Sequence, residues 1–342
     1  MLVRLLICLA CGCGLLPAAE PDFSKVDAQI QQWMDAHQYP GAGILIVSKE
    51  GKVLHERYWN GYTRETTVMI ASSSKWLEAA TMMALVDEGK MELDQPISTY
   101  LPELKNSPAG TNTLREMFSH TSSLNSIPIN DHLGVETFPA QLAAGRTGVK
   151  PGQEFAYGGT ALATASRAVE VVAGRPWLTV FGEKIAQPCG MRKTVTGHNL
   201  WTYSNLVGGD LFPCSDAADY MNFLQMILHD GEVNGRQVLS TNAIHEMQAD
   251  QIGRATVTRP EYPEITLGQK HQSVYGLGEW RLVLDEHGDA VVLSSPSFAG
   301  FFPWIDKKHG LAGVFVGRAN GMGFDAFHAS AILSKLAGDA ME

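Results

Sequence analysis

The strand-like segments of this chain lie near its two ends, and a long stretch with few strand signals separates them. Near the N-terminus, apolar runs at 43–48 and 52–59 flank Lys49-Glu50-Gly51, an arrangement that predicts a β-hairpin. Near the C-terminus, four further runs are joined by short turn segments, which favours antiparallel pairing. These four runs span 275–284, 290–294, 298–305 and 311–318. The pattern therefore predicts one antiparallel sheet that both ends of the chain build.

Helical periodicity fills most of the remaining chain. It occurs at 23–37, at 216–229 and at 324–336, and 97–200 mixes helical runs with loops rich in proline and glycine. We therefore expect an α/β fold of the α+β type. Its antiparallel sheet would be flanked by helices, with a mostly helical region inserted between the two parts of the sheet.

The predicted domain organisation follows from these elements. One domain spans 20–342, with a sheet region at about 20–75 and 200–342 and a helical region at about 76–200. Hydrophobic residues make up 45% of the chain and charged residues 18%, as in globular proteins. The net charge of −10 disfavours contact with a phosphate backbone, so we expect no nucleic-acid partner.

The first 19 residues have the composition of a signal peptide. One early cation, Arg4, precedes an apolar stretch from Leu5 to Leu16, and small residues follow at Pro17-Ala18-Ala19. We therefore expect 1–19 to be removed and the protein to be exported, to the periplasm or the exterior. A lipoprotein variant stays open. The stretch is too short for a membrane span, and no later segment is long and apolar enough for one.

Three of the five cysteines lie in this leading segment, which leaves Cys189 and Cys214 in the expected mature chain. In an oxidising compartment the two could form a disulfide, worth about 3 kcal/mol for a loop of this length. Two buried free thiols are equally compatible with the sequence. Neither cysteine has a nearby histidine that would indicate a catalytic thiol.

A candidate nucleophile follows the N-terminal hairpin. Ser72 and Lys75 form a Ser-x-x-Lys pair, and an apolar run with helical spacing begins at once. Residues i and i+3 share a helix face, so the amine of Lys75 is expected beside the hydroxyl of Ser72. Serine needs such a base, and a helix N-terminus favours negative charge on its oxygen. Ser72 is therefore the predicted nucleophile, at the start of a cleft between the sheet and the helical region.

Two later segments could complete a site. Tyr157 lies in a loop flanked by Gly158 and Gly159 before a helical run, and a neighbouring ammonium would favour its phenolate form. The segment Ser294-Ser295-Pro296-Ser297-Phe298-Ala299-Gly300 precedes a strand, and its small residues would let a substrate lie along the strand edge. On composition alone, a core tyrosine and a tight strand entry are the alternatives.

Several segments in order resemble the serine β-lactamase-like hydrolases, a group with class C β-lactamases, D-Ala-D-Ala carboxypeptidases and family VIII carboxylesterases. The resemblance covers roughly 22–338. Its segments are Ile70 to Lys75, Thr113 to Ser122, Tyr157 before its helix, Tyr275 to Gly278, and Phe298-Ala299-Gly300 before Trp304-Ile305-Asp306.

The resemblance implies a role for each matched residue. Ser72 would be the acylated nucleophile, Lys75 its first proton partner, and Tyr157 the second base and the acid for the leaving group. The backbone N–H groups of Ser72 and Phe298 would form an oxyanion hole. No metal or organic cofactor is implied. The implied substrate-binding positions are Gly159, Ser295, Ser297 and Tyr275.

The chain departs from the family pattern at two of these positions. Gly159 stands where the β-lactamases and peptidases have the asparagine of Tyr-x-Asn, which holds the substrate amide. Ser295-Pro296-Ser297 stands where a triplet beginning with lysine or histidine recognises a substrate carboxylate. An ester needs neither group, so a carboxylesterase acting on small esters is the leading hypothesis. A β-lactamase or D-Ala-D-Ala carboxypeptidase, with Arg281 or Arg318 supplying the charge, and a non-catalytic ligand-binding protein remain as alternatives.

Overall fold

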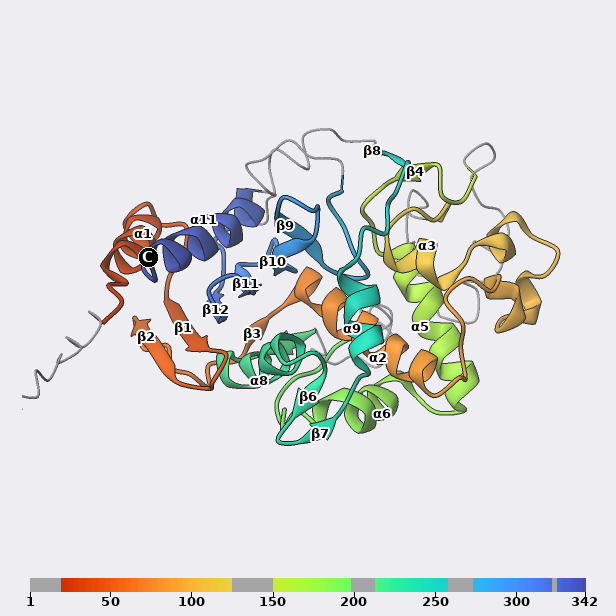
Figure 1. The fold of residues 1–342 in the computed structure, drawn as a ribbon, viewed down its shortest axis with the longest axis horizontal. Helices are drawn as coiled ribbons and strands as arrows, with labels where there is room; N and C mark the ends of the chain where they lie inside the picture. The colour runs from red at the N-terminus through yellow and green to blue at the C-terminus, as the bar shows by residue number, and fades with distance from the viewer. Residues whose placement is uncertain (1–19, 125–149, 198–212, 258–272, 322–324) are drawn as a thin grey trace, which may run out of the picture.

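A single antiparallel sheet joins the two ends of the chain in the computed structural model, which describes residues 20–124, 150–197, 213–257, 273–321 and 325–342 (Figure 1). Within the described residues its six strands run in the order β2-β1-β12-β11-β10-β9. They are β1 (Ala42–Ser48), β2 (Val53–Trp59), β9 (Trp280–Leu284), β10 (Ala290–Ser294), β11 (Phe301–Asp306) and β12 (Leu311–Gly317). The predicted sheet is confirmed, and the predicted signal peptide at 1–19 lies outside the described residues.

The two central strands bury both of their faces. On β12, Phe315 packs toward one face of the sheet, while Val314 and Val316 pack toward the other. This alternation is the period of two that a strand imposes on its side chains. At one position the packing requires a glycine, because a Cβ on Gly313 would lie 2.0 Å from the ring of Trp304 on the neighbouring strand.

Helices cover both faces of the sheet. On one face α1 and α11, from opposite ends of the chain, contact each other (Figure 1). On the other face α8 lies across β1, β11 and β12, and leads toward the helical region. The described helices are α1 (Ser24–Asp35), α2 (Ser74–Asp87), α3 (Leu114–Phe118), α5 (Thr160–Ala173), α6 (Trp177–Phe181), α8 (Ala217–Leu228), α9 (Thr241–Gln248) and α11 (Asp325–Asp339).

Short strand pairs and a buried helix connect the two regions. The pairs are β3 (Val68–Met69) with β5 (Cys214–Ser215), β4 (Glu154–Phe155) with β8 (Thr256–Val257), and β6 (Glu232–Val233) with β7 (Arg236–Gln237). Helix α2 is buried on every side from Ser74 to Leu85, as expected of a central helix without a polar face. It carries Lys75 and therefore fixes the site relative to both regions.

Two predicted strands begin later than the sequence suggested. The run from 275 becomes β9 only at Trp280, because Gly278 has a φ of +79° and the N–H of Gly276 bonds the Glu279 carbonyl at 2.9 Å. The run from 298 becomes β11 only at Phe301, after a turn closed by Gly300. The predicted sheet region at 200–342 also holds α8 and α9.

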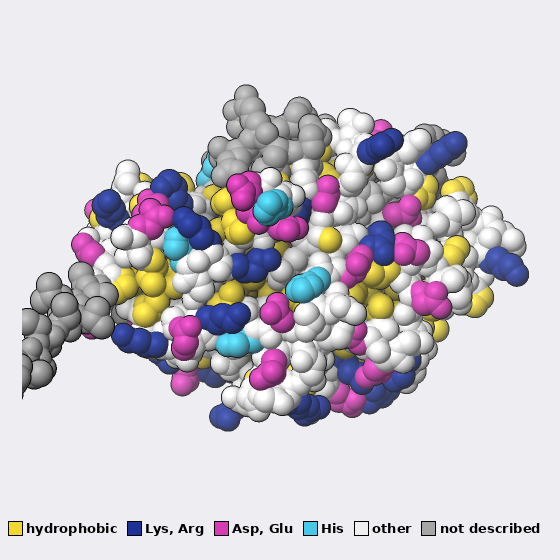
Figure 2. Space-filling model, in the orientation of Figure 1, with side chains coloured by type: hydrophobic (Ala, Val, Ile, Leu, Met, Phe, Trp, Pro, Cys, Tyr) yellow, Lys and Arg dark blue, Asp and Glu magenta, His cyan; other side chains and the backbone are white. Residues whose placement is uncertain are grey.

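Charges on the face shown in Figure 2 are mixed, with acidic and basic side chains interspersed rather than gathered by sign. None of the helices in the described ranges combines the length and apolar character needed to cross a bilayer.

Candidate active site

The nucleophile candidate lies at a strained entry to α2. Strand β3 pairs with β5, and the N–H of Ile70 bonds the Pro213 carbonyl at 2.9 Å, which anchors the approach. Ala71 then takes a φ of +36°, a conformation that costs a non-glycine residue about 1 kcal/mol or more. Ser72 follows in a 3₁₀ turn, Ala71–Ser73, that runs directly into α2. Such strain is typical of functional turns.

Ser72 and Lys75 are in contact as predicted. The Lys75 Nζ donates to the Ser72 Oγ at 3.2 Å, and both side chains are almost wholly buried, with exposed fractions of 4% and 5%. The amine is therefore within reach of the hydroxyl proton that an attacking serine must lose. The adjacent N-terminal turns also place partial positive charge beside Ser72.

Hydrogen bonds to the backbone hold this turn against the sheet. The Ser73 hydroxyl donates to the Ser295 carbonyl at 2.6 Å, and the buried Tyr220 hydroxyl donates to the Ser73 carbonyl at 2.6 Å. The Ser295 hydroxyl lies 3.1 Å from two carbonyls, those of Ser72 and Gly278. The turn is therefore tied to α8, to the entry of β11 and to the turn before β9.

Tyr157 lies beside the Ser72–Lys75 pair. The Lys75 Nζ is 4.7 Å from the centroid of the Tyr157 ring, close enough for a cation–π interaction. Trp280 and Tyr275 support the ring from other sides, with centroid distances of 5.3 Å and 6.0 Å. The structure thus brings together the three residues predicted to be catalytic, although their chemical roles remain predictions.

Two hydrogen bonds to Ser297 close the turn that contains Phe298. The Ser297 Oγ accepts the Ala299 N–H at 3.0 Å, and the Ser297 carbonyl accepts the Gly300 N–H at 3.1 Å. Among the described residues, neither the Phe298 N–H nor the Ser72 N–H has an intramolecular acceptor. Both amides are thus available to an oxyanion, and that role remains a prediction.

The predicted substrate-binding residues differ in what they offer. The hydroxyls of Ser295 and Ser297 contact backbone groups of the protein, and Tyr275 is fully buried behind Tyr157. Gly159 is the N-cap of α5, half-buried and without a side chain to donate a hydrogen bond. The two serine hydroxyls are therefore already engaged with the backbone, and Gly159 has no side-chain donor to offer.

An unpaired acid lies behind the site. Glu279 is fully buried on the turn before β9, and neither carboxylate oxygen has a hydrogen-bond partner in the described structure. Burial raises the pKa of Glu279 well above 4.5, and the cations Lys307 and Arg281 only partly oppose this. Burial likewise raises the pKa of Tyr275 and of Tyr220 well above 10. Burial thus favours the protonated form of each of these three groups near the candidate site.

The structure decides two questions that the sequence left open. Of the two alternatives for the cysteines, the free thiols are the one found: Cys189 packs into the large core, and Cys214 is held on β5 by backbone bonds to Val195. Burial raises the pKa of the Cys189 thiol to about 12, so it is inert. Arg281 cannot bind a substrate carboxylate, because its guanidinium donates to the carbonyls of Gln248, Ser273 and Gly288.

Several supporting residues could not be found from the sequence. Tyr220 and Trp280 reach the site only through tertiary packing, and no local pattern marks them. His120 lies in the matched segment Thr113 to Ser122, where the sequence indicates only a local structural role. Among the residues that the structure describes, no group of three His, Cys, Asp or Glu side chains is arranged to hold a metal ion.

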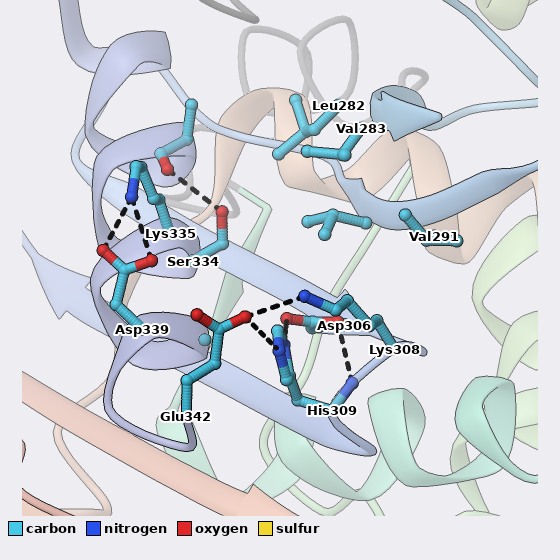
Figure 3. Close-up of a pocket in the computed structure, with 13 residues that line it drawn as sticks. Leu282, Val283, Val291, Asp306, Lys308, His309, Ser334, Lys335, Asp339 and Glu342 are labelled. Atoms are coloured by element: carbon cyan, nitrogen blue, oxygen red, sulfur yellow. Dashed lines mark hydrogen bonds and ion pairs between the residues drawn. The ribbon is translucent and has the colours of Figure 1, made fainter. Parts of the chain in front are cut away.

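A cavity away from Ser72 lies between α11 and the edge of the sheet (Figure 3). It encloses about 290 Å³ over an apolar floor that includes Leu282 and Val291. Its charged side chains pair with one another: Lys335 with Asp339, Lys308 with Glu342, and His309 with Asp306. Because these charges are already neutralised, we assign no ligand to this cavity.

A serine in contact with a lysine, at the head of a buried helix between an antiparallel sheet and a helical region, defines a serine hydrolase of the β-lactamase fold. A family model described as Beta-lactamase matches residues 26–337. The chain therefore belongs to the β-lactamase family.

Individual relatives agree with this assignment. One similar solved structure, from Bacteroides dorei DSM 17855, carries a β-lactamase assignment. Its sequence is 34% identical, its TM-score is 0.83, and the match covers 94% of this chain and 99% of that one. The D-alanyl-D-alanine-carboxypeptidase/endopeptidase AmpH of Escherichia coli K12 is 26% identical over 52% of this chain and 51% of its own. Esterase EstB of Burkholderia gladioli is 26% identical over 49% and 50%.

Proposed function

We propose that the protein is a carboxylesterase that hydrolyses small esters through an acyl-enzyme on Ser72. The Ser72 oxygen attacks the ester carbonyl as Lys75 takes its proton, and the N–H groups of Ser72 and Phe298 stabilise the oxyanion. Tyr157 protonates the departing alcohol. Water then attacks the acyl-enzyme and gives a proton to Tyr157 as the base. Lys75 returns its proton to the departing Ser72 oxygen, which frees the carboxylic acid and restores the enzyme.

The observation that carries the ester assignment is the hydroxyl of Ser295. The resemblance to the family places it where β-lactamases and peptidases have a lysine or histidine, and it lies 3.1 Å from the carbonyls of Ser72 and Gly278. Gly159 likewise supplies no amide. Both departures remove recognition of an acylamino acid while leaving Ser72 and Lys75 in contact. An ester, which needs neither recognition group, fits this site best.

A second candidate is a β-lactamase or D-Ala-D-Ala carboxypeptidase activity, and one observation favours it. Arg318 is exposed at the end of β12, and its neighbour Ala319 bonds the Ala299 carbonyl at 2.8 Å, beside Phe298. A substrate carboxylate lying along this edge could pair with Arg318. The names of the relatives support both candidates, since EstB is an esterase and AmpH a carboxypeptidase.

The deciding experiment compares three substrates on one preparation: p-nitrophenyl butyrate, nitrocefin and a D-Ala-D-Ala peptide. The proposal predicts that kcat/KM is highest for the ester and that Ser72→Ala abolishes all turnover. Nitrocefin hydrolysis much faster than ester hydrolysis would replace the esterase with a β-lactamase. Absence of turnover and of labelling by a fluorophosphonate probe would favour the non-catalytic ligand-binding alternative.

A variant can restore the missing amide. Gly159 has a φ of −110° as the N-cap of α5, so its backbone conformation is one that asparagine also adopts. If the lost amide limits β-lactam turnover, Gly159→Asn raises kcat/KM for nitrocefin by about tenfold, the scale of one hydrogen bond of about 1.4 kcal/mol. Ester turnover is the matched control and stays within about twofold.

We also propose, from the composition of 1–19, that the protein is exported to the periplasm or the exterior. Cell fractionation and N-terminal sequencing of the native protein test this. A mature chain that starts near residue 20 supports export, and a lipid on Cys11 or Cys13 would identify the lipoprotein variant. An uncut chain in the cytoplasm would overturn it.

A further inference from the structure

His120 lies in a backbone conformation that a histidine seldom adopts. It follows α3, whose start is fixed by a capping box between Thr113 and Glu116, and it has a φ of +59°. Glycine is the usual residue at this position after a helix, because a side chain there costs about 1 kcal/mol or more. Its side chain is also fully buried. A strained, buried imidazole so close to Tyr157 suggests that the ring itself is needed.

His120 accepts hydrogen bonds from the backbone on both sides of Tyr157. The His120 carbonyl accepts the Ala156 N–H at 2.9 Å, and its Nδ1 accepts the Gly158 N–H at 3.4 Å. These donors are the residues immediately before and after Tyr157. Since Nδ1 acts as the acceptor, it carries no proton in this arrangement. One residue thus holds both sides of a loop that otherwise contains two flexible glycines.

The imidazole ring also contacts the side chain that it brackets. Its centroid lies 4.4 Å from that of Tyr157, at an interplanar angle of 47°, and 5.0 Å from that of Tyr275. The Lys75 Nζ lies 4.7 Å from the same Tyr157 ring. The position of the phenol relative to Lys75 therefore depends on where His120 holds its loop and its ring.

We propose that His120 is a positioning residue that fixes Tyr157 for proton transfer, through its acceptor Nδ1 and its carbonyl. The inference rests on the proposed function, because it has meaning only if Tyr157 transfers protons. A displacement of about 1 Å at such a group can cost about a hundredfold in rate. Loss of the acceptor at His120 therefore lowers kcat while leaving the KM for a small ester nearly unchanged.

Two substitutions separate the acceptor from the backbone conformation. Glycine accepts a φ of +59° but has no acceptor, so His120→Gly removes the hydrogen bond without adding strain. Asparagine also tolerates this conformation, and its side-chain oxygen can take the place of Nδ1. Thermal unfolding of each variant shows whether it is folded before rates are compared.

The test is a double-mutant cycle with Tyr157→Phe, using p-nitrophenyl butyrate as substrate. We expect His120→Gly to lower kcat by about tenfold to a hundredfold in the wild-type background and by less than about twofold when Tyr157 is already phenylalanine. His120→Asn should restore kcat to within about threefold of wild type.

Each other outcome overturns a stated part of the account. Equal losses from His120→Gly in both backgrounds would show that His120 acts independently of the Tyr157 hydroxyl, and would refute the positioning role while leaving the esterase proposal intact. Wild-type kcat in Tyr157→Phe would refute the role of Tyr157 and this proposal together. If His120→Gly does not fold, His120→Asn tests the proposal instead. A tenfold or larger loss of kcat in that variant, once it is shown to be folded, would contradict the proposal.

Discussion

Replacing the buried Glu279 with glutamine should change how stability depends on pH. The carboxyl has no exposed surface and no hydrogen-bond partner in the described structure, and burial raises its pKa well above 4.5. Above pH 4.5 the folded protein therefore holds a proton on Glu279 more tightly than the unfolded chain does. Glutamine has nearly the same shape and no proton to exchange.

The sign and the size follow from proton linkage. For an acid whose pKa is raised on folding, the stabilising contribution is complete below the unfolded pKa, near 4.5, and is lost as pH rises toward the folded pKa. In that window each pH unit lowers the unfolding free energy of the wild type by up to about 1.4 kcal/mol from this group. Between about pH 5.5 and pH 7.5, Glu279→Gln should therefore gain up to about 3 kcal/mol relative to wild type.

Urea unfolding at a series of pH values measures this difference directly. Wild type, Glu279→Gln and Glu103→Gln are compared, where Glu103 is an exposed glutamate that serves as the control. Only the difference between Glu279→Gln and wild type should grow with pH. A difference that stays constant from about pH 5.5 to pH 7.5, or that shrinks, would refute the conclusion that folding raises the pKa of Glu279.

Three further predictions concern residues around Ser72. Gly278→Ala should lower the free energy of unfolding in urea by about 2–5 kcal/mol, because Gly278 has a φ of +79° and its added Cβ would lie 2.3 Å from the Lys75 carbonyl. Gly288→Ala is the control: Gly288 also has a positive φ but lies in open space, so the loss should be only about 1–2 kcal/mol. Ser295→Ala should lower kcat for p-nitrophenyl butyrate with KM unchanged, whereas a raised KM alone would indicate direct substrate contact. Tyr157→Phe should cut kcat at least about a hundredfold, and near-wild-type turnover would remove it from the mechanism.

The sheet was predictable because its signals are local. The hairpin at 43–59 and the strands at 290–294 and 311–318 agree with β1, β2, β10 and β12 to within about a residue at each end. The helical run expected after Tyr157 is α5, which begins at Thr160 and is closed by Gly174 at a φ of +64°. Period-two alternation and glycine stops are encoded within a few residues, so no tertiary knowledge is needed.

The late starts of β9 and β11 were not predictable from the same signals. Residues 275–279 are apolar enough to read as strand, but Gly276 and Gly278 fold them into a turn against α2 and α9. A Cβ on Gly276 would lie 2.1 Å from the Met247 carbonyl, so the close approach decides the local structure. That contact joins segments about thirty residues apart in the sequence, and periodicity carries no information about it.

Part of the candidate site could likewise be predicted from the sequence, and part could not. Ser72 and Lys75 are three residues apart, so helical geometry alone predicts their contact, which the structure has at 3.2 Å. The two carbonyls contacted by the Ser295 hydroxyl lie in distant segments, and its commitment to the backbone appears only in three dimensions. His120 could not be predicted at all, because neither its positive φ nor its contacts with the Tyr157 loop produce a pattern in the sequence.

The central claim is that Ser72 is the nucleophile of an acyl-transfer site. Treatment with a fluorophosphonate probe, followed by peptide mapping by mass spectrometry, tests it most directly, with ester turnover measured on the same samples. The account predicts a single modified serine, Ser72, loss of turnover in step with labelling, and neither labelling nor turnover in Ser72→Ala. Modification of another serine, or ester turnover that survives in Ser72→Ala, would contradict it.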